Sequence, residues 1–507
     1  MVRNSCALLF VPSLSLAFSS PPRPQHLQQQ NGREDARGRW RTAHDTDNMS
    51  LSNHPKAYGS AALALAFAAG ILVTLGFKDF YPDLERRYQR RRTRRDVAGG
   101  SSSTDPSRRS SLFWGPPVQL EDHETASEAG EAAALAAGAA WNPPLIADGV
   151  AGAIGNTPLI KIRSLSEATG RTILAKAEFL NAAGNTPKDR VALSMIEAAE
   201  AAGQLVPGRG DTIYEGTVGS TGISLATLAR ARGYRAYICM PNDMAMEKVD
   251  LLRHLGATVE RVDPAPIASP DHFVNLARRR AVEHAAKAGD GSVGYFADQF
   301  ENPANFAAHL HTTGPEIVYQ TGGTLGAFVA GAGTGGTIAG VAKYLKEEAG
   351  LSGLQVILAD PQGSGLYNKI RHGVMYSNTE KEGTRRRQQV DTIVEGIGIN
   401  RVTENFEAGR ELIDDAIKVT DEQACRMARW LVEKDGIFAG SSSAVNCVAA
   451  VVAATRLPEG SQVVTILCDS GTRHLSKFWK HVAAMGLEED EHSADLFSVL
   501  KIDPAKQ

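Results

Sequence analysis

The chain has 507 residues, roughly three times the length of a typical domain, so a single small module is excluded. Hydrophobic residues make up 43% and charged residues 22%, an ordinary globular composition that excludes a wholly disordered or fibrous protein. The formal net charge of −3 gives no overall basic field for nucleic acid, and five widely spaced cysteines without a C-x-x-C pair argue against a disulfide scaffold or a structural zinc site. We therefore expect neither a nucleic-acid partner nor a bound metal.

Residues 1–55 carry prolines, glutamines and scattered arginines with no apolar period, and we expect this segment to be disordered. Residues 59–77 follow as 19 consecutive uncharged residues. A helix of that length spans about 28 Å, close to the thickness of the hydrocarbon core of a bilayer. The sequence therefore predicts a transmembrane anchor at 56–78 that contacts the lipid bilayer. A buried Ala/Gly-rich helix of a globular domain would give the same pattern.

Residues 79–145 are expected to form a linker that is first basic and then Ala-rich. Seven arginines lie between positions 86 and 95, whereas only Arg41 and Lys56 closely precede the anchor. By the positive-inside rule, this asymmetry leaves everything after the anchor in the cytosol.

The pattern changes at about residue 146, where short β-rich runs begin to alternate with amphipathic stretches. The β-rich runs are residues 173–179, 236–240, 259–263, 325–333, 356–360 and 463–469. The helix-like stretches are residues 192–202, 224–232, 248–255, 338–349 and 421–434. This alternation predicts an α/β domain with a mostly parallel sheet, whose ligands bind at the carboxyl ends of the strands.

The turn from Gly331 to Thr337 follows an apolar strand and precedes a helix. Its glycines let the backbone approach an anion closely, and the helix start offers free N–H groups, so we expect a phosphate site. Gly331, Gly333 and Gly336 also satisfy G-x-G-x-x-G, and Asp360 follows 24 residues after Gly336. A dinucleotide-dependent oxidoreductase is therefore an alternative.

Lys188 lies behind a Gly/Asn/Thr loop and just inside a helix start, where the helix dipole opposes a positive charge. A neutral imine nitrogen is better tolerated there than an ammonium. A lysine whose pKa is lowered in this way suits Schiff-base formation with a carbonyl cofactor. A surface lysine paired with Asp189 is the alternative, and the residues alone favour neither.

Two further turns carry hydroxyls at the ends of strands. Residues Glu215–Gly222 would bring hydroxyls and free N–H groups to a helix start, which suits a carboxylate ligand or simply caps the helix. Residues Cys468–His474 would place the hydroxyl of Ser470 at a strand terminus, where a simple cap is again the alternative.

Together these turns resemble the cysteine synthase/cystathionine β-synthase family of fold-type II pyridoxal-phosphate enzymes, over about two-thirds of the chain. The matching motifs are Ile154–Leu159, Met240–Pro241, Asp298–Phe300, Asn302–Asn305, Thr312–Glu316, Gly333–Thr337, Glu395–Gly398 and Ser441–Ser443. The resemblance implies a two-domain fold like that of the tryptophan synthase β-subunit and a homodimer. It places a smaller subdomain at about 190–300 within a catalytic domain at 146–486, followed by a C-terminal tail at 487–507.

The resemblance also implies pyridoxal 5'-phosphate as cofactor, joined to Lys188 through a Schiff base. The other implied cofactor-binding residues are Ser220, Gly333, Thr334, Gly335, Gly336, Thr337 and Ser470, of which Ser470 would face the pyridine nitrogen. The implied substrate-binding residues are Thr217, Gly219, Ser220, Thr221, Gln299 and Gly396. The expected reaction is β-replacement, in which O-acetylserine and sulfide, or another thiol, give cysteine and acetate in cysteine biosynthesis from serine. Lys188 would move the α-proton.

Three positions depart from the family pattern. Val218 and Ser220 stand where the family usually has Ser and Asn, and Pro187 stands where Val or Ile is common. With the amino-terminal anchor, these departures make the chain resemble the fungal membrane-associated branch, usually placed at the mitochondrial outer membrane. Besides the dinucleotide enzyme, two alternatives stay open: a cystathionine β-synthase-type condensation of serine with homocysteine, and a catalytically weakened, membrane-tethered amino-acid-binding protein.

Overall fold

The structure is a computed structural model that describes residues 146–375, 392–486 and 495–503. All of these belong to the second of two units into which the chain divides, Arg108–Gln507. The predicted disordered segment, transmembrane anchor and linker lie outside the described residues, as does most of the C-terminal tail. Within the described ranges, no helix combines the length and apolar character needed to cross a membrane.

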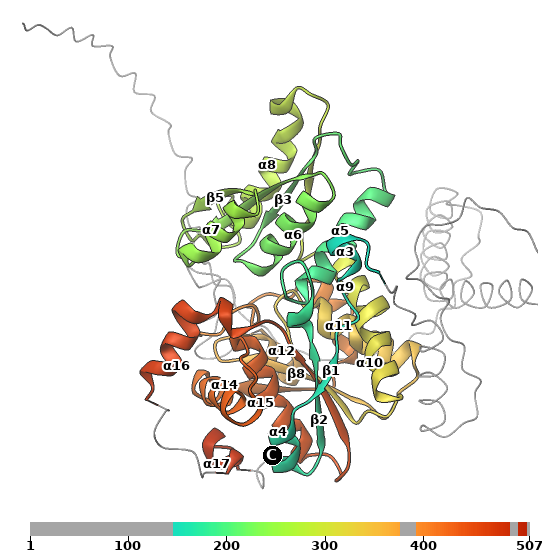
Figure 1. The fold of residues 1–507 in the computed structure, drawn as a ribbon, viewed down its shortest axis with the longest axis vertical. Helices are drawn as coiled ribbons and strands as arrows, with labels where there is room; N and C mark the ends of the chain where they lie inside the picture. Colours follow the sequence, from blue (N-terminus) through green and yellow to red (C-terminus); the bar gives the residue numbers. More distant parts are fainter. Residues whose placement is uncertain (1–145, 376–391, 487–494, 504–507) are drawn as a thin grey trace, which may run out of the picture. The chain divides into compact units, whose positions relative to one another are not determined.

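A six-stranded sheet forms the larger part of the described fold (Figure 1). Its order is β1-β2-β10-β7-β8-β9, and every neighbouring pair is parallel except β1 with β2. The strands are β1 (Leu159–Lys161), β2 (Thr172–Ala177), β7 (Ala327–Gly331), β8 (Gln355–Pro361), β9 (Asp415–Val419) and β10 (Gln462–Leu467). In β10, Val463 belongs to one hydrophobic core and Val464 to another. The sheet is therefore buried on both faces, as is usual for parallel sheets.

Helices cover both faces of this sheet. On one face α4 (Arg163–Thr169), α14 (Asp421–Asp435) and α15 (Ser441–Thr455) share its core. On the other face, α10 (Gly314–Thr321) and α11 (Gly336–Lys343) contribute to the second hydrophobic core. The shorter helices are α3 (Gly149–Gly152), α9 (Pro303–Ala308), α12 (Leu366–His372), α13 (Glu404–Glu407), α16 (Lys480–Ala484) and α17 (Leu496–Leu500). Single turns are the 3-10 helices η1 (Glu178–Leu180), η4 (Arg410–Leu412) and η5 (Gly471–Arg473) and the π-helices η2 (His309–Thr313), η3 (Tyr344–Glu348) and η6 (Leu475–Trp479).

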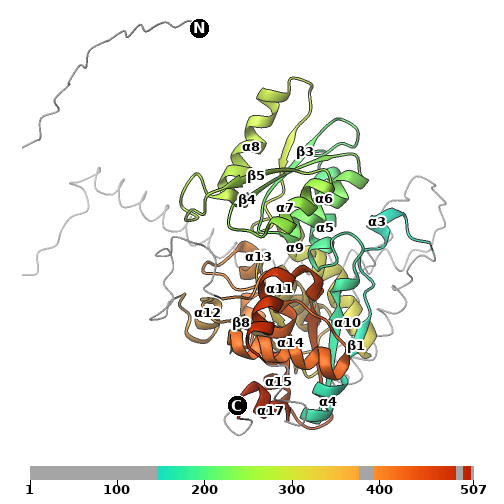
Figure 2. The same cartoon turned by 60° about the vertical axis from the view of Figure 1, so that its left-hand side comes forward.

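A second, four-stranded sheet is parallel throughout, in the order β5-β4-β3-β6 (Figure 2). Its strands are β3 (Thr212–Gly216), β4 (Arg235–Pro241), β5 (Thr258–Val262) and β6 (Gly294–Phe296). The helices packed on one face are α5 (Lys188–Ala201), α6 (Ser220–Ala231) and α7 (Met246–His254). Helix α8 (Phe273–Ala288) packs on the other face.

The predicted α/β fold with mostly parallel sheets is confirmed. Each of the six predicted strands coincides with an observed strand, namely β2, β4, β5, β7, β8 and β10. The helix predicted from residue 192 begins earlier, at Lys188. Pro187 stands just before it with a φ of −59°, which suits a helix start.

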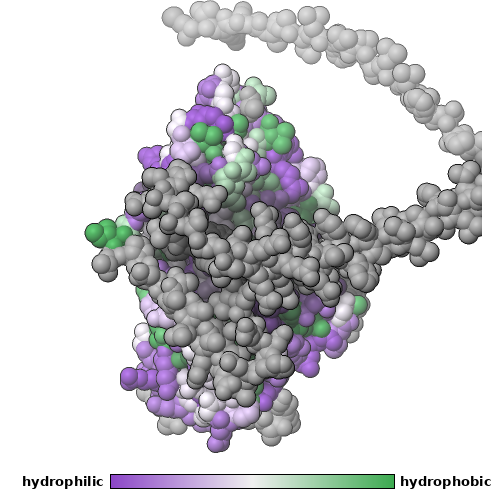
Figure 3. All heavy atoms as spheres, turned by 90° about the vertical axis from the view of Figure 1, so that its right-hand side faces the viewer, coloured by the Kyte–Doolittle hydropathy of each residue, from purple (hydrophilic) through white to green (hydrophobic). Residues whose placement is uncertain are grey.

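The surface of the described residues mixes polar and apolar side chains. On the face shown in Figure 3, hydrophobic residues lie in small groups between hydrophilic ones. Apolar side chains exposed in this scattered way are normal for a folded protein and indicate no particular partner.

Candidate active site

The carboxyl ends of strands from both sheets meet at a cavity of about 670 Å³. Ten of the predicted site residues line it: Lys188, Thr217, Ser220, Thr221, Gln299, Gly333, Thr334, Gly335, Thr337 and Gly396. The other three predicted site residues, Gly219, Gly336 and Ser470, are not among the described residues that line the cavity. Parallel sheets bind ligands at the ends of their strands, so this cavity is the candidate active site.

Lys188 is the first residue of α5, and its side chain lines the cavity. Burial lowers the pKa of its amine, because the ammonium loses its hydration. Asp189 is engaged elsewhere, since it accepts hydrogen bonds from Gly184 N (2.7 Å) and Ser224 Oγ (2.6 Å). No carboxylate in the described part of the chain forms an ion pair with Lys188 Nζ. The alternative of a surface lysine paired with Asp189 is therefore wrong.

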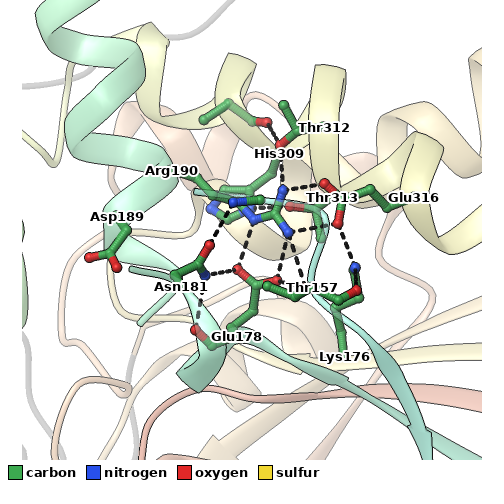
Figure 4. A network of polar contacts seen from close by, with 12 residues as sticks. Thr157, Lys176, Glu178, Asn181, Asp189, Arg190, His309, Thr312, Thr313 and Glu316 are labelled. Atoms are coloured by element: carbon green, nitrogen blue, oxygen red, sulfur yellow. Dashed lines mark hydrogen bonds and ion pairs between the residues drawn. The ribbon is translucent and has the colours of Figure 1, made fainter. Parts of the chain in front are cut away.

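A buried ionic cluster holds the first turn of α5 (Figure 4). Arg190 forms ion pairs with Glu178 (Nε to Oε2, 2.8 Å) and with Glu316 (Nη1 to Oε1, 2.5 Å). Lys176 Nζ lies 2.5 Å from Glu316 Oε2, and all four side chains are at most 2% exposed. Burial acts to raise the pKa of Glu178, but the Arg190 guanidinium lowers it to about 2. The cluster therefore ties the helix that begins with Lys188 to β2 and α10.

The glycine turn between β7 and α11 lines another part of the cavity. Gly335 has a φ of +86°, which favours glycine, and a Cβ there would overlap Phe406. Gly336 packs against Asn305. The first N–H groups of α11 have no intrahelical acceptor, so this turn can hold an anionic group such as a phosphate.

Residues 217–221, the 217–221 loop, run from the end of β3 into the first two residues of α6, which begins at Ser220. Thr221 Oγ1 donates to Gln299 Oε1 (2.5 Å), and Gln299 Nε2 donates to Glu215 Oε1 (3.2 Å). Burial raises the pKa of Glu215 to about 8, so its carboxyl is mostly protonated at neutral pH. The loop thus brings hydroxyls and a helix start to the cavity without a competing carboxylate charge from Glu215.

An ion pair between the two halves of the described fold lies beside this loop. Lys248 of α7 forms an ion pair with Glu395 (2.7 Å), and its stem packs on Gly219. His474 Nε2 lies 3.0 Å from Asp469 Oδ2. Burial acts to lower the pKa of His474, but Asp469 and Glu395 raise it to about 9. His474 is therefore protonated at neutral pH.

Two serines lie near the cavity: Ser470, which follows the cavity-lining residue Asp469, and Ser442. Ser470 Oγ accepts a hydrogen bond from Thr472 N (3.3 Å) and caps η5. Ser442, in the first turn of α15, lines the cavity and lies beside Cys468 at the end of β10. Ser442 is not among the predicted site residues. Three consecutive serines before an Ala/Val-rich run predict a helix start, but not which hydroxyl faces a ligand.

Asp360 is not placed to bind the ribose of a dinucleotide, as the oxidoreductase alternative requires. It is fully buried and accepts a hydrogen bond from Tyr367 N (2.7 Å) at the start of α12. In the parts of the chain that the structure describes, no group of three or more His, Cys, Asp or Glu could hold a metal ion.

The cavity combines a desolvated lysine amine, a glycine-lined anion site and a hydroxyl-bearing loop at a helix start. These groups fit a cofactor that carries both an aldehyde and a phosphate, since an unpaired amine can react with the aldehyde and the glycine turn can hold the phosphate. On this α/β fold they define the class of fold-type II pyridoxal-phosphate enzymes.

Comparison with known proteins gives the same class, because residues 150–469 match the family described as "Pyridoxal-phosphate dependent enzyme". "Cysteine synthase 2" of Neurospora crassa is 69% identical over 467 residues, which cover 90% of this chain and 100% of that protein. "Putative mitochondrial cysteine synthase" of Saccharomyces cerevisiae is 56% identical, over 70% of this chain and 88% of that protein. The crystal structure of O-acetylserine dependent cystathionine beta-synthase from Helicobacter pylori is 35% identical with a TM-score of 0.54, and the match covers 66% of this chain and 99% of that chain. The chain belongs to the cysteine synthase/cystathionine β-synthase family of pyridoxal-phosphate-dependent enzymes.

Proposed function

We propose that this protein is a cysteine synthase, which replaces the β-substituent of an activated serine, such as O-acetylserine, with sulfide or another thiol. The observation that carries the proposal is the desolvated amine of Lys188 in the same cavity as the glycine turn and the 217–221 loop. The names of the Neurospora and yeast relatives support the same reaction.

Lys188 and the glycine turn would hold the cofactor, Lys188 at its aldehyde and residues 333–337 at its phosphate. Bound there, pyridoxal phosphate supplies an electron-withdrawing ring that stabilises negative charge at the substrate's α-carbon. The Ser470 hydroxyl would face the ring nitrogen, because Ser470 follows Asp469, which lines the cavity, and accepting a hydrogen bond from Thr472 N leaves the Ser470 proton available.

The 217–221 loop would bind the substrate's α-carboxylate through hydroxyls and the free N–H groups at the start of α6. Gln299 holds the Thr221 side chain in place. Lys188, released when the substrate's amine takes its place at the aldehyde, would take the proton from the α-carbon, because burial lowers its pKa and favours the neutral amine. Acetate then leaves the β-carbon with its bonding electrons, sulfide adds there, and Lys188 returns the proton to the α-carbon.

Replacing Lys188 with alanine tests this proposal. Lys188→Ala should abolish cysteine formation from O-acetylserine and sulfide and should remove the visible absorbance of the bound cofactor. Lys287→Ala is the matched control, because Lys287 is an exposed lysine of α8 whose partner is Glu283. Unchanged turnover and absorbance in Lys188→Ala would contradict the proposal. Formation of cystathionine from serine and homocysteine, without cysteine from O-acetylserine, would instead identify the cystathionine β-synthase-type reaction.

The anchor is a separate part of the proposal: residues 56–78 would hold the protein in the mitochondrial outer membrane, with the catalytic domain facing the cytosol. The uncharged run at 59–77 and the arginines that follow it support an anchor. The name of the yeast relative supports a mitochondrial location. In the full chain, Leu65→Arg with Leu72→Arg should release the protein into an alkaline carbonate extract, whereas Ser101→Arg with Ser102→Arg should not. Extraction of the unsubstituted chain would contradict the anchor.

Two architectural points complete the proposal. The smaller subdomain at about 190–300 is supported by the four-stranded sheet, whose strands lie between Thr212 and Phe296. A homodimer is supported by the family resemblance, and light scattering on the full chain in detergent should give twice the mass of 54.1 kDa after subtraction of the detergent. A monomeric mass would contradict it.

A further inference from the structure

His309 lies outside the cavity lining but contacts a residue that belongs to it. The imidazole is 0% exposed, at the start of the π-helix η2, which joins α9 to α10. π-Helical turns within α-helices are frequent at functional sites. Helix η2 faces α11 closely, because a Cβ at Gly340 would lie 2.8 Å from Leu310 N and 2.9 Å from His309 Cβ. Gly340 is one turn after Thr337 on α11, so this close approach brings the imidazole to Thr337.

Each ring nitrogen of His309 contacts one threonine hydroxyl. Nε2 lies 3.1 Å from Thr337 Oγ1, and Nδ1 lies 2.9 Å from Thr313 Oγ1. Burial lowers the pKa of His309 to about 3, so the imidazole is neutral at physiological pH and carries a single N–H. One nitrogen therefore donates to its threonine and the other accepts from it.

The surroundings of Thr313 decide between the two tautomers. Thr313 is 0% exposed, and within the described residues its hydroxyl has His309 Nδ1 as its only hydrogen-bond partner. If Nδ1 carried the proton, the Thr313 hydroxyl proton would be buried without an acceptor, which is costly. The favoured tautomer therefore has Thr313 donating to Nδ1 and Nε2–H donating to Thr337 Oγ1.

This arrangement sets the direction of the Thr337 hydroxyl. Because Thr337 Oγ1 accepts from His309, its own proton is free to point into the cavity, which Thr337 lines. The rest of η2 is held independently, since Thr312 Oγ1 donates to Ala308 O (2.6 Å) and accepts from Arg190 Nη1 (3.0 Å) (Figure 4).

We propose that His309 is a positioning residue for the cofactor phosphate. Its Nε2–H donates to Thr337 Oγ1, so that the Thr337 hydroxyl donates its own proton to a phosphate oxygen. This inference rests on the proposed function, which places that phosphate at residues 333–337. With the opposite tautomer, the Thr337 oxygen would present lone pairs to the phosphate and repel it.

The test compares His309→Gln with His309→Asn in the full chain. The glutamine amide can take the place of Nε2–H, whereas the asparagine amide reaches only the position of Nδ1. Two quantities are measured: the dissociation constant of pyridoxal phosphate from the reconstituted protein and the ³¹P chemical shift of the bound phosphate. His309→Asn should raise the dissociation constant about tenfold, the loss expected for one hydrogen bond to an anion. His309→Gln should stay close to the unsubstituted protein in both quantities.

Thr337→Val provides the second arm of the experiment. It should weaken cofactor binding and shift the ³¹P signal, and adding His309→Asn to it should cause no further change. Equal effects of His309→Gln and His309→Asn, or a full additional loss in the Thr337→Val background, would overturn the role of His309 while leaving the phosphate site intact. No effect of Thr337→Val on either quantity would instead overturn the placement of the phosphate itself, and the role of His309 with it.

Discussion

Replacing Arg190 with leucine tests how strongly the ionic cluster holds the start of α5. The guanidinium bonds both carboxylates in bidentate fashion, at 2.8 and 2.8 Å to Glu178 and at 2.5 and 2.7 Å to Glu316. Its removal leaves Lys176 as the one cation of the cluster beside two buried acids. Breaking a buried pair by removing one partner costs about 3–5 kcal/mol, whereas breaking an exposed helical pair, as in Lys287→Ala, costs about 0.3–0.5 kcal/mol.

Denaturant titration followed by tryptophan fluorescence measures this difference. At pH 7 the midpoint of Arg190→Leu should fall far below that of the unsubstituted protein, and the midpoint of Lys287→Ala should barely move. The pKa of Glu178 is lowered in the folded state from 4.5 to about 2, so its stabilising contribution is complete above pH 4.5 and is lost as the pH falls toward 2. The difference in denaturation midpoint between Arg190→Leu and the unsubstituted protein should therefore become smaller as the pH falls from 4.5 toward 2. Matching midpoints for Arg190→Leu and Lys287→Ala at pH 7 would refute the reasoning.

Three further predictions follow from single contacts. Ser470→Ala should slow cysteine formation about tenfold by removing one hydrogen bond to the cofactor ring, whereas Ser442→Ala, which removes a hydroxyl bonded to Cys468, should keep the rate; equal rates would contradict the role of Ser470. The pKa of His474 is raised from 6.5 to about 9, so its stabilising contribution is complete below pH 6.5 and is lost as the pH rises through 9. The denaturation midpoint of His474→Gln should accordingly lie below that of the unsubstituted protein at pH 6 and approach it above pH 9. A difference in midpoint that stays the same from pH 6 to above pH 9 would contradict the contribution of the ion pairs of His474. Gly335→Ala should weaken cofactor binding, measured by reconstitution, because its φ is +86° and the new Cβ meets Phe406; unchanged binding would show that the turn can shift.

Local pattern was enough to predict the long buried strands and the four turns. Strands such as β8 and β10 are mostly apolar at both odd and even positions, and their sequence carries the signal of burial on both faces. Strands β1, β3, β6 and β9 are absent from the predicted β-rich runs: β1 and β6 have three residues each and are only partly buried, and β3 and β9 mix polar residues with apolar ones. The helix predicted at 338–349 begins as α11, and its second half is the π-helix η3, which apolar periodicity does not distinguish from an α-helix.

Lys188 and the glycine turn could be predicted because their chemistry depends on neighbours in the chain. The role of Glu316 could not, since it bonds Arg190 across 126 residues of sequence. The place of Ser442 at the cavity could not be predicted either, because the fold alone brings the start of α15 beside the end of β10. Contacts of this kind depend on topology, which a local pattern does not contain.

Helix α5 belongs to both halves of the described fold. Its apolar side chains pack with the four-stranded sheet, while the ion pairs of Arg190 fasten its first turn to the six-stranded sheet, where the glycine turn also lies. Lys188 and the glycine turn are therefore connected through the ion pairs of Arg190, whereas the 217–221 loop follows β3 in the other sheet. A change that broke the ion pairs of Arg190 would therefore disturb the spacing between Lys188 and the glycine turn without altering either of them.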